Sequence, residues 1–344
     1  MKNFGLADFF IEKNRKRTTF LDGIDAIINW SRIEKILKTK LGRIDNAPSP
    51  GVKAYPALLM FKILLLQQWY GLSDQDTEFA LLDRISFSRF TRLSLHESVP
   101  DHTTICRFRN LLVEKNILKM LLDEINRQTE KQGKLIKKGV AVDASIIASA
   151  ARPRKQVDMD TVTCDREEGS PESVDSEKLK VTYSHDPDAA WLKKGKECHY
   201  GYKVHTAVDA ETGLVLAVHV TPANYSDTGE LERLVEDANL PEKTRIYADK
   251  GYTSKANSNM LKEHRQKDAI MSRAYRNKPL SKRQQSRNRL ISKKRYIVER
   301  VFGTLKKCYD LARASYIGKA KVQGELLLST LAYNLKRSLF LLPA

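Results

Sequence analysis

The run Gly139-Val-Ala-Val-Asp143 is apolar up to its last residue, and Arg245-Ile-Tyr-Ala-Asp249 has a similar form. Short runs rich in Val, Ile and Tyr that lack a helical period are typical of buried strands. Each run ends in an aspartate, and burying a charged carboxylate is costly unless a cation or hydrogen bonds compensate for it. We therefore predict two strands whose terminal acids, Asp143 and Asp249, lie together if the strands are neighbours.

A third acid lies in a helical context, in Arg295-Tyr-Ile-Val-Glu299-Arg-Val-Phe-Gly-Thr-Leu-Lys306. At about 100° per residue, Arg295, Glu299 and Lys306 fall within about 40° of one another. The adjacent apolar stripe, which would pack on the sheet, consists of Val298, Val301, Phe302 and Leu305. The simpler alternative is a surface pair between Arg295 and Glu299, which contributes only about 0.2–0.5 kcal/mol.

The order of elements in residues 135–344 predicts a mixed sheet with helices. Two apolar segments flank a turn that contains Gly213, as in a hairpin, and a helix and two further strands follow. These segments are 203–209, 214–220, 229–239, 244–248 and 268–271. Strand, hairpin, helix, strand, helix, strand and long helix form an α+β or α/β arrangement. We predict that residues 135–344 form the second domain.

Residues 1–134 have helical periodicity and predict an all-helical first domain. Asp101 is a candidate N-cap for a helix that begins at residue 102. This helix-turn-helix-like segment would present polar and basic side chains to DNA, as recognition helices do. The candidate contacts are His102, Thr103, Thr104, Arg107 and Arg109. The alternative is an ordinary surface helix of an all-α bundle.

The balance of charges points to an anionic partner. The 344 residues include 60 Lys and Arg against 42 Asp and Glu, a formal net charge of +18. Such a basic chain favours a nucleic acid as partner, although a merely basic soluble protein is the alternative. The four cysteines form no CxxC pair, which argues against a zinc ribbon or a disulfide framework.

Two segments carry concentrated charge of opposite sign. Within a loop at 152–198, the residues 156–177 hold eight acids against one arginine, and we expect this run to be mobile. The segment 273–295 holds ten Lys and Arg and no acid. Such a run repels itself unless a polyanion neutralises it, so it predicts a phosphate-binding strip beside Glu299. Its candidate DNA contacts are Arg283, Arg287, Lys293 and Lys294.

We expect neither a signal peptide nor a membrane span. The first residues lack a long apolar core, and the apolar stretch 57–66 is too short to cross a bilayer and contains Lys62. These features predict a cytoplasmic protein without a membrane partner.

Two strand-borne aspartates and a helical glutamate suit phosphodiester chemistry. Two Mg²⁺ or Mn²⁺ ions about 3.5–4 Å apart can stabilise both the attacking and the leaving oxygen of an in-line displacement. Magnesium prefers hard oxygen ligands and keeps several waters, so a few carboxylates and substrate phosphates suffice. We predict that Asp143, Asp249 and Glu299 bind two such ions.

At these residues the chain resembles the DDE transposases of bacterial insertion sequences. Asp143, Asp249 and Glu299 match the three catalytic acids of that family one by one. Further matching stretches are Val99-Pro-Asp-His-Thr-Thr-Ile-Cys-Arg-Phe-Arg109, Tyr200-Gly-Tyr-Lys-Val-His205, Thr221-Pro-Ala-Asn-Tyr-Ser-Asp227 and Ala248-Asp-Lys-Gly-Tyr252.

The resemblance is to the branch with a tyrosine–arginine–glutamate–lysine signature around the last acid. Arg295 and Lys306 match the arginine and lysine of that signature, and we expect both to contact DNA. Ser292 stands where the signature has its tyrosine, so a contact made by that tyrosine is not expected here.

The resemblance covers nearly the whole chain and implies a helical domain followed by an RNase H-like catalytic domain. It implies binding of the terminal inverted repeats in double-stranded DNA, cleavage that frees 3′-hydroxyls, and their joining to target DNA by transesterification without a covalent intermediate. It also implies a homodimer or larger complex that works on the bacterial nucleoid.

Two other classes of protein stay open. One is an RNase H-like nuclease or resolvase that cuts DNA without joining it. The other is a catalytically silent DNA-binding regulator, against which the presence of all three acids argues.

Overall fold

The computed structural model describes residues 19–42, 54–94, 96–151, 154–159, 179–184, 186–276 and 278–341. The described residues before 135 contain helices and no strand, as the periodicity predicts. These helices are α2 (Phe20–Ile27), α3 (Trp30–Leu41), α4 (Ala57–Tyr70), α5 (Asp74–Asp83), α6 (Ile85–Thr91), α7 (His102–Glu114) and α8 (Ile117–Lys131). None of the helices in the described part of the chain is long and apolar enough to cross a membrane.

The helix ends follow local chemistry. Helix α4 begins after Pro56 and ends at Gly71, whose φ of 61° suits glycine. The Ser73 side chain accepts a hydrogen bond from the Asp76 backbone and caps α5. Asp101 accepts one from the Thr104 backbone and caps α7, as predicted.

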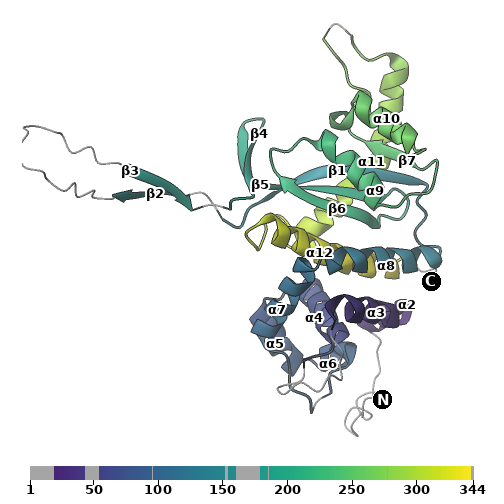
Figure 1. The fold of residues 1–344 in the computed structure, drawn as a ribbon. Coiled ribbons are helices and arrows are strands. Elements are labelled where there is room, and N and C mark those ends of the chain that lie inside the picture. The colour runs from purple at the N-terminus through teal and green to yellow at the C-terminus, as the bar shows by residue number, and fades with distance from the viewer. Residues whose placement is uncertain are drawn as a thin grey trace, which may run out of the picture.

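A mixed sheet forms the second part (Figure 1). Its strands are β1 (Gly139–Ala148), β4 (Ala190–Lys194), β5 (Glu197–Asp209), β6 (Val215–Pro222), β7 (Arg245–Ala248) and β8 (Lys267–Ile270). Strand β1 pairs antiparallel with β5 and parallel with β7, which pairs parallel with β8. Strand β6 pairs antiparallel with the far edge of β5, beside the short β4. The order β6-β5-β1-β7-β8 with these directions is the RNase H-like sheet, which confirms the predicted fold class.

Helices cover both faces of the sheet (Figure 1). They are α9 (Leu231–Asp237), α10 (Lys255–Glu263), α11 (Lys282–Cys308) and α12 (Lys319–Leu339), with short 3-10 turns η1 (Asp227–Glu230) and η2 (Lys250–Tyr252). Val140 and Val142 of β1 share a core cluster with α9 and α10. The alternate residue Ala141 belongs to the cluster that contains α11 and α12. Asp143 follows the same alternation and therefore points to the α11 side.

Helix α12 joins the two parts of the chain. It packs on α8, α4, α2 and α7 as well as on β6, so the helices and the sheet share one core cluster. It also covers the free edge of β6. Gln323 bonds to the backbone of Val220 and Val218, and Asn334 bonds to both backbone groups of Val215. Two amide side chains thus replace a missing neighbouring strand.

The described ends of the predicted acidic loop form strands. Strand β2 (Arg154–Met159) pairs antiparallel with β3 (Leu179–Ser184) in a separate hairpin that projects away from the main sheet (Figure 1). The expectation of a loop at 152–198 is therefore wrong for residues 154–159 and 179–184, which pair with each other, and for residues 190–194 and 197–198, which belong to β4 and β5. Residues 160–178, which carry most of the acids, lie outside the described residues.

Candidate active site

The two aspartates lie at corresponding positions on neighbouring parallel strands. The last pair of the β1–β7 ladder is Val142 with Ala248, and Asp143 and Asp249 are the next residues on each strand. This confirms that the strands are neighbours. Asp143 lies in the middle of β1 rather than at its end, because β1 continues along β5 to Ala148. Asp249 directly follows β7 and precedes η2.

One guanidinium joins the two acids. Arg295 of α11 lies with Nη2 2.8 Å from Oδ2 of Asp143 and with Nη1 3.4 Å from Oδ1 of Asp249. Arg295 is only 8% exposed, because α11 crosses the sheet at this point. The prediction that Arg295 contacts DNA is therefore not supported, since its fork is occupied by the two carboxylates.

Burial and the arginine act on Asp143 in opposite directions. Burial raises the pKa of the Asp143 carboxyl, while the charge of Arg295 and a hydrogen bond from the Ala144 backbone lower it; burial has the larger effect. Burial and the nearby Asp249 both disfavour the charged form of Asp143, and the adjacent cation of Arg295 favours it.

Glu299 lies one turn after Arg295 on α11 and is exposed. Its oxygens do not join those of Asp143 and Asp249 within 4.8 Å, the spacing at which three ligands could share one ion. Among the described residues, the group that meets this criterion is Glu232, Glu236 and His264, at the surface on α9 and at the end of α10. The structure thus brings Asp143 and Asp249 together. It places Glu299 farther away, on the same face of α11 as Arg295.

Lys306 is half-buried rather than free for DNA. Its Nζ donates a hydrogen bond of 2.9 Å to the backbone oxygen of Ile146, and burial lowers its pKa. The contact ties the end of α11 to β1, the strand of Asp143.

Tyr252 is a further residue of this site that the sequence analysis did not single out. Its ring is 1% exposed, and its hydroxyl has no hydrogen-bond partner among the described residues. Burial raises its pKa far above the usual value, and the charges of Asp227, Asp143 and Asp249 raise it further. The signal for it was its place in Ala248-Asp-Lys-Gly-Tyr252, next to the second aspartate.

Comparison with known proteins identifies the family. The family described as a transposase DDE domain matches residues 169–335, and a second transposase domain, DUF772, matches residues 9–111. The transposase for insertion sequence element IS1106 of Neisseria meningitidis serogroup B is 41% identical over 235 residues, which cover 67% of this chain and 76% of that protein. The chain belongs to the DDE transposases of bacterial insertion sequences. The first family match contains Asp249 and Glu299 and begins after Asp143.

Solved structures of another transposase also align with this one. The Mos1 transposase paired-end complex with left transposon end has a TM-score of 0.22 and 9% identity, over 97% of this chain and 91% of that chain. The Mos1 mariner paired end complex with Mn has a TM-score of 0.21 and 10% identity over the same shares.

Membership of the DDE family implies the use of divalent metal ions, and the residues present fit such ions. Asp143 and Asp249 offer hard oxygen donors of the kind that Mg²⁺ and Mn²⁺ prefer. The second oxygen of Asp249 makes no hydrogen bond with a described residue, so this oxygen is available as a metal ligand.

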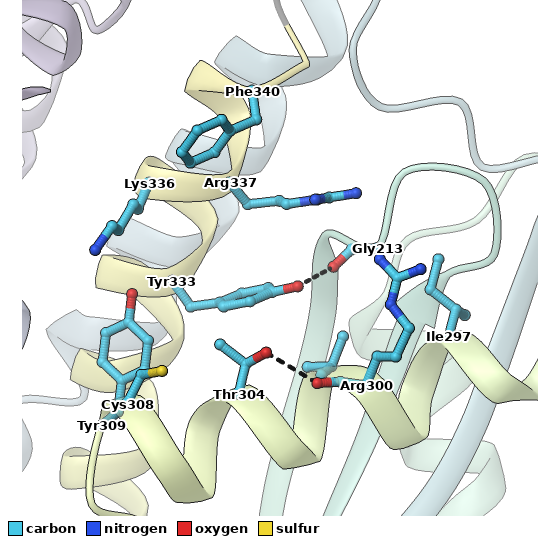
Figure 2. Close-up of a pocket in the computed structure, with 11 residues that line it drawn as sticks. Gly213, Ile297, Arg300, Thr304, Cys308, Tyr309, Tyr333, Lys336, Arg337 and Phe340 are labelled. Atoms are coloured by element: carbon cyan, nitrogen blue, oxygen red, sulfur yellow. Dashed lines mark hydrogen bonds between the residues drawn. The ribbon is translucent and has the colours of Figure 1, made fainter.

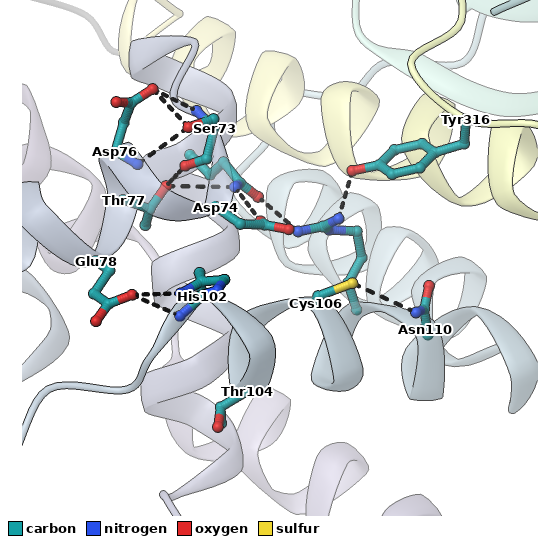
Figure 3. A network of polar contacts seen from close by, with 12 residues as sticks. Ser73, Asp74, Asp76, Thr77, Glu78, His102, Thr104, Cys106, Asn110 and Tyr316 are labelled. Atoms are coloured by element: carbon teal, nitrogen blue, oxygen red, sulfur yellow. Dashed lines mark hydrogen bonds and ion pairs between the residues drawn. The ribbon is translucent and has the colours of Figure 1, made fainter.

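The predicted DNA contacts in α7 of the transposase are partly occupied by local bonds (Figure 3). His102 is exposed. The carboxylate of Glu78 accepts a hydrogen bond from the His102 backbone N–H and also bonds to the Nδ1 atom of its ring. Thr103 donates to Asp101, and the backbone of Thr104 completes the cap. Arg107 is exposed on this helix.

Arg109 of the transposase is not placed to contact DNA. Its guanidinium is buried and binds Asp74 of α5 and the hydroxyl of Tyr316, which lies between α11 and α12 (Figure 3). The prediction for this residue is wrong for a physical reason, because α7 turns this side of the helix toward the core. Arg109 connects the helical part to the C-terminal part instead.

Residues 282–295 of the basic segment form the first half of α11, so this part of the predicted strip and Glu299 belong to one helix. Arg283 and Lys293 are exposed. Arg287 donates to the backbone oxygens of Ile270 and Asp268 at the end of β8. Lys294 pairs with Glu211 at 3.0 Å.

A pocket of 260 Å³ lies on the opposite side of α11, between that helix, α12 and the β5–β6 turn (Figure 2). Tyr333 donates a hydrogen bond from its hydroxyl to the backbone of Gly213 at this turn. By helix geometry, the α11 residues that line the pocket point away from Arg295 and Glu299. They are Ile297, Arg300, Val301, Thr304 and Cys308. The pocket is therefore separate from the acids.

Proposed function

We propose that the transposase cleaves DNA strands at the ends of its element and joins the resulting 3′-hydroxyls to target DNA, with two divalent metal ions at Asp143, Asp249 and Glu299. The observation that carries the proposal is the position of Asp143 and Asp249, directly after the last pair of two parallel strands and on one guanidinium. A rigid sheet holds both carboxylates, and rigid placement of ligands is what such catalysis needs.

Each residue has a distinct role in this proposal. Asp143 and Asp249 would hold the metal, and the exposed Glu299 would complete the ligand set from the next turn of α11. The ions, when bound, would stabilise the attacking and the leaving oxygen of the displaced phosphate. Arg295 orients the two aspartates and offsets their mutual repulsion.

The proposal includes binding of the terminal inverted repeats by the helical part and by the first half of α11. The support is the excess of positive charge and the exposure of Arg107, Arg283 and Lys293. A homodimer or larger complex belongs to the same proposal, because two ends must be held together before they are joined.

The test is cleavage and joining of a labelled duplex that carries the end sequence of the element. Wild type, Asp143→Asn, Asp249→Asn and Glu299→Gln are compared in Mg²⁺, in Ca²⁺ and without metal. Glu263→Gln, at an exposed acid on α10, is the matched control. We expect joined product only for wild type and the control, and only with Mg²⁺. Full activity of any variant at the three acids would contradict the ligand set.

The two alternatives give other results in the same assay. Nicked product that is never joined would identify a nuclease or resolvase. Tight binding with no cleavage by wild type in any condition would identify a regulator.

A further inference from the structure

A hollow of 530 Å³ lies where the three parallel strands begin. The strand register places Gly139, Arg245 and Lys267 side by side across β1, β7 and β8. Gly139 has no side chain, and the ring of Tyr247 fills the space that a side chain at this position would occupy. The hollow therefore has an aromatic floor with basic side chains around it.

The hollow has far more positive than negative charge. Six Lys and Arg line it, against two acids, Glu211 and Glu242. Each acid already has a partner, since Glu211 pairs with Lys294 at 3.0 Å and Glu242 with Arg265 at 2.6 Å. Four exposed cations make no ion pair with any residue that the structure describes. They are Lys138, Lys243, Arg245 and Lys267, here called the strand-start cations.

The hollow is continuous with the basic half of α11. Arg283, Arg287 and Lys294 fall within about 40° on the helix and form one stripe. Arg287 is fixed on the end of β8, and Lys294 lines the hollow. The stripe thus leads from the exposed start of α11 to the strand-start cations.

The distance to the acids is set by the strands. Arg245 and Asp249 are four residues apart on β7, as Gly139 and Asp143 are on β1. At 3.3 Å per residue, the strand-start cations lie about 13 Å from the acids, the length of about four base pairs of duplex.

We propose that the strand-start cations bind the phosphate backbone of double-stranded DNA a few base pairs from the point of cleavage. The inference rests on the proposed function and adds a surface to it. Point charges spread over a sheet edge suit a phosphate backbone and carry no base readout. They hold the duplex in position while the acids act.

The test is the salt dependence of binding to a random-sequence duplex, measured without metal so that no cleavage occurs. The variant carries Lys138→Gln, Lys243→Gln, Arg245→Gln and Lys267→Gln together. A control with the same change of charge carries Lys193→Gln, Lys196→Gln, Lys255→Gln and Lys262→Gln, all exposed on β4, in the turn after β4 and on α10. Thermal unfolding verifies that both proteins fold.

Each lost phosphate contact reduces the slope of log K against log salt by about 0.9. We expect a reduction of up to about 3.5 for the variant and a smaller one for the control. Equal slopes for variant and control would overturn the proposal. Tighter binding of an RNA duplex of the same length by wild type would overturn it too, and would make RNA the partner.

The outcome is independent of catalysis. If the variant has an unchanged slope and still cleaves and joins DNA, the strand-start cations do not bind DNA, and the proposed role of the acids is unaffected. A reduced slope in a protein whose wild type never cleaves would support the surface and contradict the proposed activity.

Discussion

Oδ2 of Asp143 and Nη2 of Arg295 are 2.8 Å apart, although 152 positions separate the two residues in the chain. The same guanidinium reaches Asp249 through its other nitrogen. A protein cation thus neutralises two carboxylates that would otherwise repel each other. The arrangement holds the two acids in fixed positions.

Replacing Arg295 tests this relationship. Arg295→Gln leaves two partly buried carboxylates without their cation, and we expect a loss of about 3 kcal/mol of unfolding free energy. Divalent ions should restore part of it, because they neutralise the same charges and bind only the folded state. Thermal unfolding with and without Mg²⁺ is the measurement, with Arg300→Gln on the opposite side of α11 as control. Equal stabilisation of variant and control by Mg²⁺ would contradict the role of Arg295.

The buried His205 predicts a pH dependence of stability. Its ring is 0% exposed on β5, and burial lowers its pKa to about 4. The unfolded chain takes up this proton near pH 6.5 and the folded one only near pH 4, so stability falls as the pH drops between these values.

Because of His205, we expect the free energy of unfolding to be about 2 kcal/mol lower at pH 5 than at pH 7. His205→Gln keeps a partner for Thr221, which bonds the ring in the native protein, and removes the proton. Urea unfolding at the two pH values measures the effect, with the exposed His96→Gln as control. If His205→Gln has the same pH dependence as wild type, the folded protein protonates this ring normally.

The amide side chains of α12 predict a stability effect at the edge of the sheet. Asn334→Ala removes the partners of both backbone groups of Val215, which are buried. We expect a loss of about 2 kcal/mol, the usual cost of leaving a buried polar group without a partner. Lys336→Ala, exposed on the same helix, should change little. Denaturant unfolding compares the two, and similar losses would mean that α12 stabilises the protein only through apolar packing.

Substitutions at Arg109 and Arg107 should have different effects, the first on stability and the second on DNA binding. Arg109→Leu removes a buried link to Asp74 and Tyr316, and we expect a loss of about 3 kcal/mol without a direct effect on the salt dependence of DNA binding. Arg107→Leu should change stability little and reduce the salt dependence of DNA binding, because its side chain is exposed on α7. The two measurements are chemical unfolding and titration with a duplex. A changed salt slope for Arg109→Leu alone would restore the original prediction for that residue.

The strand positions of Asp143 and Asp249 could be predicted from the sequence because the cause is local, whereas the pairing of β1 with β7 is a long-range contact. Two short apolar runs form strands wherever they are buried, and the terminal acid follows each run. Helix geometry likewise places Arg295 and Glu299 on one face. It does not say that α11 crosses the sheet at Arg295, which is why Arg295 is buried while Glu299 is exposed.

The remaining features depend on contacts that no local pattern shows. The partner of Arg109 lies 207 positions away at Tyr316. The strand-start cations lie in or just before three separate strands, which are adjacent only through the register of the sheet. Tyr252 is an ordinary aromatic residue in the sequence, and only packing places its hydroxyl near the acids.

The cover that α12 gives to β6 has a consequence for the newly made protein. A chain that has been synthesised only as far as α11 contains every strand of the sheet, yet the backbone groups at the outer edge of β6 have no partner. Such an edge pairs readily with other chains. During synthesis the outer edge of β6 is therefore covered last, and a product that stops before Lys319 is expected to aggregate.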